Sequence, residues 1–91
     1  MNTLHHDREN TKYVLTLENK EEAWVKYDMR DNVMYLTYAS VPSNLQGKGI
    51  GKELVIKTFE KLTVEGYKAV AICSYVRAVK NRSDKWKEVI G

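Results

Sequence analysis

A glycine-rich turn between an alternating apolar segment and an amphipathic segment constrains the fold more than any other feature. Residues 46–52, QGKGIGK, contain three glycines, two lysines and no acidic residue. Residues 33–41 before them are rich in β-formers, and the apolar residues after them recur at helical spacing. Such a turn presents backbone N–H groups at a helix N-terminus, where the helix dipole favours negative charge. The sequence therefore predicts a strand-turn-helix unit that binds a phosphate or pyrophosphate.

The spacing within this turn excludes two common phosphate loops. A P-loop has four residues between its first glycine and a Gly-Lys-Ser/Thr ending, but Gly47 and Gly51 lie closer together and Lys52 is followed by Glu53. A Rossmann fingerprint has a third glycine where Lys52 stands, and an acid about twenty residues on, after a second strand. Here that strand ends in residues 72–74, ICS. A tight structural turn is the alternative interpretation, but two lysines without an acid favour anion binding.

Length and composition indicate one small globular domain. The 91 residues are 43% hydrophobic and 30% charged. The single cysteine, Cys73, excludes an internal disulfide and suits a reducing compartment, so we expect a cytoplasmic protein. No apolar run is long enough to cross a bilayer and the polar start has no signal-peptide core, so we expect no membrane association. The sequence leaves the oligomeric state open.

Hydrophobic periodicity predicts a mixed fold with the order β-β-β-α-β-α. We expect strands over residues 13–17, 23–29, 33–41 and 68–73. Because a helix separates the last two strands, they are expected to pair in parallel. Residues 1–11 are polar and are expected to be a disordered tail, so that residues 12–91 form the single domain.

Helix and strand ends carry their own signals. Pro42 ends the third predicted strand, because it cannot donate to a ladder. The helix that begins at Ile50 is expected to end at Gly66, which suits a left-handed C-terminal cap. Ser74 is predicted to N-cap a helix running to about residue 81, and Ser83 to N-cap a last turn around residue 86.

The same loop carries a family resemblance. The pattern Gln-x-x-Gly-x-Gly in residues 46–51 resembles motif A of the GNAT (Gcn5-related) acetyltransferases, whose loop cradles the pyrophosphate of coenzyme A. Residues 37–42 (TYASVP), residues 73–78 (CSYVRA) and the basic helix after them look like the short stand-alone branch of that family. The resemblance covers about residues 12–90. It implies a GNAT-like α+β core: an antiparallel meander, the glycine-loop helix, a parallel strand and a C-terminal helix.

The resemblance also implies a cofactor site for acetyl-CoA or coenzyme A across the splayed ends of the third and fourth predicted strands. Backbone groups of Val41 and Pro42 would hold the pantetheine arm, and Gln46 would shape the turn. The pyrophosphate would be bound by the backbone N–H groups of Gly47, Lys48, Gly49, Ile50 and Gly51. Lys48 and Lys52 would add positive charge, and Asn81 and Lys85 would reach the far side of the cofactor.

Two residues are candidates for a chemical role. Cys73 ends the fourth predicted strand close to where the resemblance places the thioester, and a following helix N-terminus would favour the thiolate. An inert buried cysteine is the alternative. Tyr38 is a candidate proton donor or acceptor near a strand end, or only a residue that packs on the sheet. His5 and His6 lie in the polar tail, where we expect them to be solvated, and two ligands do not make a metal site.

These observations lead to one function and two alternatives. The leading hypothesis is a small acetyltransferase that passes an acetyl group from acetyl-CoA to an amine, with the acceptor unknown. The short family usually has histidines where Tyr38 and Ser83 stand, which motivates a coenzyme A-binding module without turnover as the second hypothesis. The net charge of +3 raises nucleic-acid binding as the third, but no aromatic residues interleave with the basic ones, which argues against it.

Overall fold

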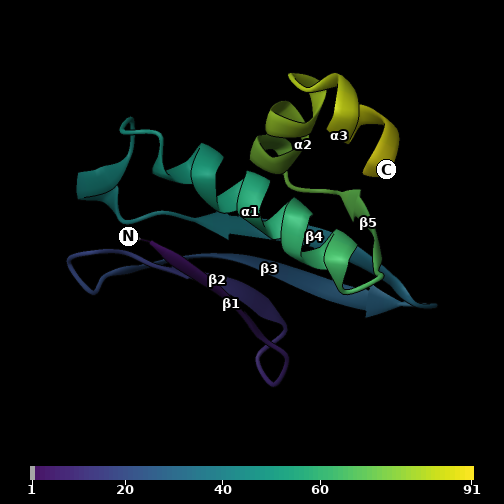
Figure 1. Ribbon diagram of the computed structural model, residues 1–91, viewed down its shortest axis with the longest axis horizontal. Coiled ribbons are helices and arrows are strands. Elements are labelled where there is room, and N and C mark those ends of the chain that lie inside the picture. Colours follow the sequence, from purple (N-terminus) through teal and green to yellow (C-terminus); the bar gives the residue numbers. More distant parts are fainter. Residues whose placement is uncertain (1) are drawn as a thin grey trace.

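A five-stranded sheet carries all three α-helices on one face in the computed structural model, which describes residues 2–91 (Figure 1). The strands follow chain order across the sheet: β1 Thr3–Asp7, β2 Lys12–Thr16, β3 Glu22–Arg30, β4 Val33–Ser40 and β5 Lys68–Ala71. The helices are the 3-10 turn η1 Ser43–Leu45, α1 Ile50–Val64, α2 Ser74–Asn81 and α3 Asp84–Val89. Strands β1 to β4 are antiparallel neighbours, and β5 pairs with β4 in parallel. The predicted α+β fold and its parallel last strand are therefore confirmed.

The prediction of a disordered tail is wrong for residues 3–7. They form β1, an edge strand that pairs along its whole length with β2, with Leu4 opposite Leu15 and His6 opposite Tyr13. Leu4 packs against the hydrophobic core. A short segment with one aliphatic residue gives almost no periodic signal, so the sequence did not show this strand. Met1 lies outside the described residues.

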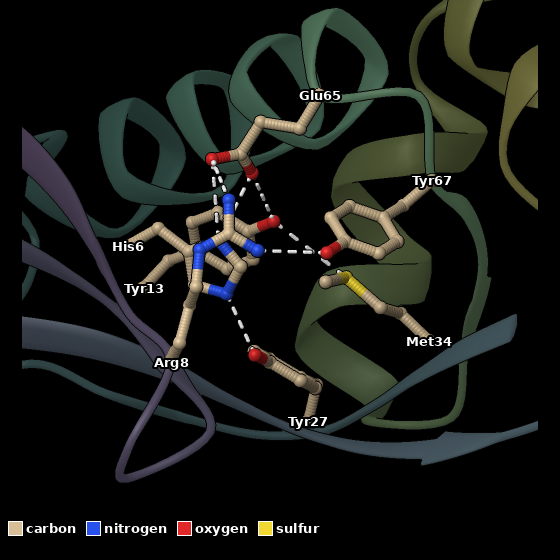
Figure 2. Close-up of polar contacts among 7 residues, drawn as sticks. All are labelled: His6, Arg8, Tyr13, Tyr27, Met34, Glu65 and Tyr67. Atoms are coloured by element: carbon tan, nitrogen blue, oxygen red, sulfur yellow. Dashed lines mark hydrogen bonds and ion pairs between the residues drawn. The ribbon is translucent and has the colours of Figure 1, made fainter. Parts of the chain in front are cut away.

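A network of polar contacts anchors β1 to the end of α1 (Figure 2). The side chain of His6 is only 4% exposed, against the expectation that it would be solvated. Its Nδ1 lies 3.0 Å from a carboxylate oxygen of Glu65, and its Nε2 lies 2.6 Å from the hydroxyl of Tyr27. The imidazole also stacks on Tyr13, with ring centroids 4.1 Å apart. Because a carboxylate can only accept, Nδ1 carries the proton and donates to Glu65.

Helix α1 covers one face of the sheet, and its inward side chains form part of the hydrophobic core. Its inward residues recur at helical spacing and are fully or nearly fully buried: Leu54, Val55, Thr58, Phe59 and Leu62. They pack against inward strand residues such as Val25 and Leu36. The ring of Phe59 lies 5.4 Å from the ring of Trp86, which brings α3 onto the same core. No helix in the described part of the chain is long and apolar enough to cross a bilayer.

The predicted caps are confirmed at two ends and wrong at one. Gly66 follows α1 with a φ of 86°, and Tyr67 N–H donates to Leu62 O at 2.9 Å, which together make a Schellman motif. Ser83 N-caps α3 and accepts from the backbone N–H of Trp86. For α2 the N-cap is Cys73 and not Ser74, which is the first helical residue.

Strands β4 and β5 diverge beyond Leu36. The β4–β5 ladder ends at the pair Leu36–Ala71, and Leu36 O then accepts from both Ile72 N–H and Cys73 N–H, at 3.0 and 2.9 Å. Strand β4 runs on to Ser40, and a bulge opposite β3 leaves one extra residue, Thr37. The carboxyl ends of the two parallel strands are therefore splayed, with the glycine turn next to the longer one.

Candidate functional site

The glycine turn forms the N-terminus of α1 through two left-handed residues. Gly47 has a φ of 83° and Gly49, the N-cap, a φ of 82° with ψ near 0°. A Cβ at either position would meet no atom within 4 Å, so only the backbone conformation requires glycine there. No side chain caps the helix, and its first main-chain bond runs from Glu53 N–H to Gly49 O. The N–H groups of residues 50–52 thus have no partner within the helix.

Polar side chains around the turn leave its N–H groups accessible to an anion. Gln46 Nε2 donates to Val41 O at 3.2 Å and closes the turn over the end of β4. The nearest acid, Glu53, is paired with Lys57 at 2.8 Å and accepts from Asn2. The hydrogen bond from Lys57 is the main cause of the lowered pKa of Glu53. The predicted lysines of the turn, Lys48 and Lys52, are exposed.

A cavity of about 320 Å³ opens between this turn, the end of β4 and α2. Its lining residues are Ala39, Val41, Gln46, Gly47, Gly51 and Tyr75. The cavity therefore brings together three predicted cofactor residues of the turn, Gln46, Gly47 and Gly51, and one at the end of β4, Val41. The lining combines backbone donors of the turn with the apolar side chains of β4, which suits a ligand with an anionic end and a less polar arm.

A second cavity, of about 480 Å³, lies on the other side of Tyr75, between α1 and α2. Lys52 and Arg82 give it positive charge, and its other lining residues are Ile56, Tyr75, Ala78, Val79 and Ser83. Asn81 and Lys85 were predicted to reach the far side of the cofactor, but neither residue lines this second cavity. The ammonium of Lys85 lies over the Trp86 ring, 4.6 Å from its centroid.

Tyr75 separates the two cavities and was not predicted as a site residue. A Cβ added at Gly51 would lie 2.5 Å from the Tyr75 hydroxyl oxygen, so this glycine allows the phenol to lie on the first turn of α1. The only sign in the sequence that Tyr75 belongs to the site was its position within residues 73–78, which carry part of the family resemblance. Arg82 was missed as well, because a single arginine after a basic helix gives no pattern.

The two chemical candidates both lie where β4 and β5 diverge. Cys73 is half-buried at the N-cap of α2, and its backbone N–H is bonded to Leu36 O, two residues before Tyr38. Tyr38 is 57% exposed on the sheet face away from the helices, with its ring 5.6 Å from the ring of Trp24. Side chains alternate along β4, so its neighbour Ala39 lines the cavity and Tyr38 does not.

Comparison with known proteins settles the family. A family model described as GCN5-related N-acetyl-transferase matches residues 12–89, most of the chain. The chain belongs to the GCN5-related N-acetyltransferase family. Among solved structures, a Staphylococcus aureus protein described as a GCN5-like putative N-acetyltransferase matches with a TM-score of 0.70 at 23% identity, over 98% of this chain and 87% of that one. At that identity the likeness shows the fold. No curated protein matches the chain.

Proposed function

We propose that this GNAT protein is an acetyl-CoA-dependent N-acetyltransferase that acts on an amine in the cytoplasm. The observation that carries the proposal is the cavity at the N-terminus of α1. The glycine turn, whose N–H groups at residues 50–52 have no partner within the helix, borders one side of it, and the end of β4 and Tyr75 of α2 border the other. The pyrophosphate of acetyl-CoA would accept hydrogen bonds from residues 47–51. The pantetheine arm would then run along Ala39 and Val41 toward Cys73.

The reaction that this arrangement supports is a direct transfer. The acceptor amine, in its neutral form, forms a bond from its nitrogen to the thioester carbonyl carbon. The carbon–sulfur bond then breaks, the amine nitrogen loses a proton to a base, and coenzyme A leaves as a thiolate that takes up a proton. Backbone N–H groups at the splayed strand ends would polarise the thioester carbonyl. Tyr38 points to the sheet face away from the cavity, so it is our candidate for moving the amine proton from an acceptor that approaches the splayed strand ends from that face.

A two-step route through Cys73 is the alternative mechanism. Its thiolate would attack the thioester, release coenzyme A and hold the acetyl group as a Cys73 thioester, from which the amine then takes it. The half-buried position of Cys73 at the N-cap of α2, where β4 and β5 diverge, supports this route.

A coenzyme A-binding module without turnover is the second candidate function. The residues that line the first cavity include no histidine and no carboxylate. A protein that binds the cofactor there without a strong base would hold acetyl-CoA and not transfer its acetyl group.

Calorimetric titration of the protein with acetyl-CoA, coenzyme A, ATP and NAD tests the proposal. We expect saturable binding of the two coenzyme A forms and no comparable binding of ATP or NAD. The Gly49→Ala variant should lose this binding. Gly66→Ala is the matched control, because Gly66 has a similar φ of 86°, open space around its Cβ position and no place in the cavity.

The outcomes separate the candidate functions. Equal binding of all four ligands, or none, would overturn the cofactor site. Equal loss of affinity in Gly49→Ala and Gly66→Ala would show that stability and not the turn controls binding. Acetyl-CoA binding without acetylation of a broad panel of amines would favour the binding module.

A further inference from the structure

The two edges of the sheet differ in how their backbone groups are covered. At the β5 edge, Gly91 N–H donates to Ala69 O at 2.8 Å and Ala71 N–H donates to Gly91 O at 3.0 Å. At the other edge, β1 pairs only with β2. An edge strand leaves every second N–H and C=O group without a ladder partner. Strand β1 is therefore the open edge of the sheet within residues 2–91.

Strand β1 lacks the features that usually protect an edge strand. Its five residues, TLHHD, contain no proline and no lysine, and no bulge interrupts its pairing with β2. Its one acidic residue, Asp7, accepts hydrogen bonds from the backbone and side chain of Asn10 in the turn that follows. Proline, lysine and bulges prevent edge-to-edge pairing in natural sheets, so nothing in β1 itself opposes pairing with another strand.

A groove of about 450 Å³ runs along this edge between β1 and α1. Helix α1 lines it with a stripe of side chains at helical spacing, and the other lining residues belong to the start of β1. The groove is lined by Asn2, Thr3, Leu4, Lys57, Glu60, Lys61 and Val64. Val64 is 86% exposed, the most of any large hydrophobic residue in the described part of the chain. Apolar surface thus lies beside the open strand edge.

Two charged residues of the groove have no partner among residues 2–91. The ammonium of Lys57 is held, since it donates to Glu53 at 2.8 Å and to Asn2 O at 3.2 Å. Glu60 and Lys61 are exposed, and neither side chain forms an ion pair or hydrogen bond. Because consecutive residues of a helix do not face each other, these two do not pair with one another. One acid and one base therefore remain open to a partner.

Contacts between β1 and α1 fix where these two charges lie along the edge. Lys57 contacts Asn2 at one end, and Glu65 contacts His6 at the other, so the two elements run in the same direction. Leu4, midway between residues 2 and 6, therefore lies beside residues 60 and 61. A twofold axis at Leu4 brings Glu60 of one copy to Lys61 of the other, and does so twice. The open edge is thus complementary to itself in charge, as a twofold interface requires.

We propose that β1 pairs antiparallel with β1 of a second copy of this chain, about a twofold axis at Leu4. The two five-stranded sheets then form one continuous sheet. The two grooves join, the Leu4 side chains lie opposite each other, and Val64 of one copy packs on the aliphatic stem of Lys57 of the other. Two Glu60–Lys61 ion pairs close the joined groove.

The small contact area predicts a weak, reversible dimer. Each copy contributes one short strand and one helical stripe, which is at the low end of specific interfaces, so we expect a Kd of roughly 10–100 µM. Backbone hydrogen bonds between the two strands supply the attraction, and the ion pairs select the register. The protein is then a monomer at low micromolar concentration.

Sedimentation velocity of the whole protein, from tenfold below to tenfold above that Kd, measures the association. The test variants are Glu60→Lys, Lys61→Glu and the double exchange that carries both substitutions. The matched controls are Lys87→Glu and Glu88→Lys, which change the same charges at two adjacent exposed positions of α3.

Each single variant at residues 60 and 61 should weaken the dimer about tenfold, because it places like charges against each other at two points of the interface. The double exchange should restore the Kd of the parent protein to within about twofold. The α3 variants should leave the Kd unchanged. A folding defect or a change in net charge cannot produce the restoration, because both would persist in the double variant or appear in the α3 controls.

Amide hydrogen exchange locates the interface without any substitution. As the protein concentration rises through the Kd, exchange should slow at alternate amides of residues 2–6, whose N–H groups point away from β2. The amides of Ala69 and Ala71 on β5 should keep their rates.

Three results would overturn the proposal. One is a protein that stays monomeric across the whole concentration range, in which case the open edge does not pair with itself. Another is a dimer whose Kd is the same in the parent protein and in all three test variants. The third is a dimer that slows exchange elsewhere but not in β1. None of these measurements needs acetyl-CoA, so their outcome is independent of the proposed acetyl transfer.

Discussion

Replacing Glu65 by Gln should destabilise the fold, because this carboxylate joins the end of α1 to β1, to β2 and to the turn between them (Figure 2). It accepts from the Tyr13 hydroxyl at 2.8 Å, from His6 Nδ1 at 3.0 Å and from Arg8 at 3.3 Å, and its side chain is 15% exposed. A hydrogen bond to a buried charged group contributes about 1.5–3 kcal/mol, whereas the exposed Arg8 adds about 0–1 kcal/mol. Gln keeps one acceptor oxygen, so we expect a loss of about 2–3 kcal/mol.

The pH dependence of stability should change in the same variant. Burial raises the pKa of Glu65, but the hydrogen bonds from Tyr13 and His6 outweigh it, so the pKa is lowered overall. A carboxyl with a lowered folded-state pKa stabilises the fold above its unfolded pKa of about 4.3, and this contribution is lost as the pH falls through the folded value. The stability of Glu65→Gln should therefore depend less on pH in the acid range than that of the parent protein.

Urea unfolding followed by fluorescence measures both effects, and Glu60→Gln is the matched control. Glu60 is an exposed acid on the same helix, so its replacement removes the same charge without the network. A loss of about 2–3 kcal/mol corresponds to a shift in melting temperature of about 8–24 °C for a domain of this size. If the two variants unfold within about 0.5 kcal/mol of each other, the network does not anchor β1 as the distances suggest.

Three further substitutions give separate tests. Cys73→Ser should leave acetyl-CoA binding unchanged, and its transfer rate decides the mechanism: a rate near that of the parent protein excludes the two-step route, whereas loss of transfer with intact binding supports it. Ser83→Ala removes the cap of α3 and should cost about 1 kcal/mol in urea unfolding; an unchanged midpoint would contradict the capping bond. Gly51→Ala should push the Tyr75 phenol away and lower acetyl-CoA affinity about tenfold in calorimetry. The free energy of unfolding should change by about 1 kcal/mol or less, because Tyr75 is 45% exposed. Unchanged affinity would mean that Tyr75 does not border the cofactor.

Local chemistry explains why most of the fold was predictable from sequence. Alternation in residues 23–29 and 33–41, and the helical spacing after Ile50, are periodic signals of burial. Gly66 and Ser83 mark helix ends by mechanisms that act within a few residues. The parallel pairing of the last strand followed from the intervening helix alone.

The missed features depend on contacts between residues that lie far apart in the chain. Strand β1 is held by His6, whose partners Glu65 and Tyr27 lie 59 and 21 residues away. No local pattern shows that a histidine in a polar segment will be buried. The direction of the Tyr38 side chain depends on the bulge at Thr37, which shifts the register by one residue. Tyr75 reaches the site only because α2 packs over Gly51.

The roles of the predicted cofactor residues remain predictions, with differing structural support. Gly47, Gly49 and Gly51 form or adjoin the free end of α1, and Gln46 closes the turn onto Val41. The structure gives less support to the predicted roles of Asn81 and Lys85, because the cavity between α1 and α2 is lined by Lys52 and Arg82 and not by these two residues. The difference arises because a helix face, and not a position in sequence, decides which residue of a basic segment points into a groove.

Backbone amide chemical shifts, measured while acetyl-CoA is added to the whole protein, test the central claim most directly. Our account predicts that the largest changes fall on residues 47–52 of the glycine turn, with smaller ones on Ala39, Val41, Cys73 and Tyr75. Changes at His6 and the other residues of the β1 network should be absent. If the turn amides keep their shifts at saturating acetyl-CoA, or if the changes gather on β1 and β2, the anion site at the start of α1 is wrong.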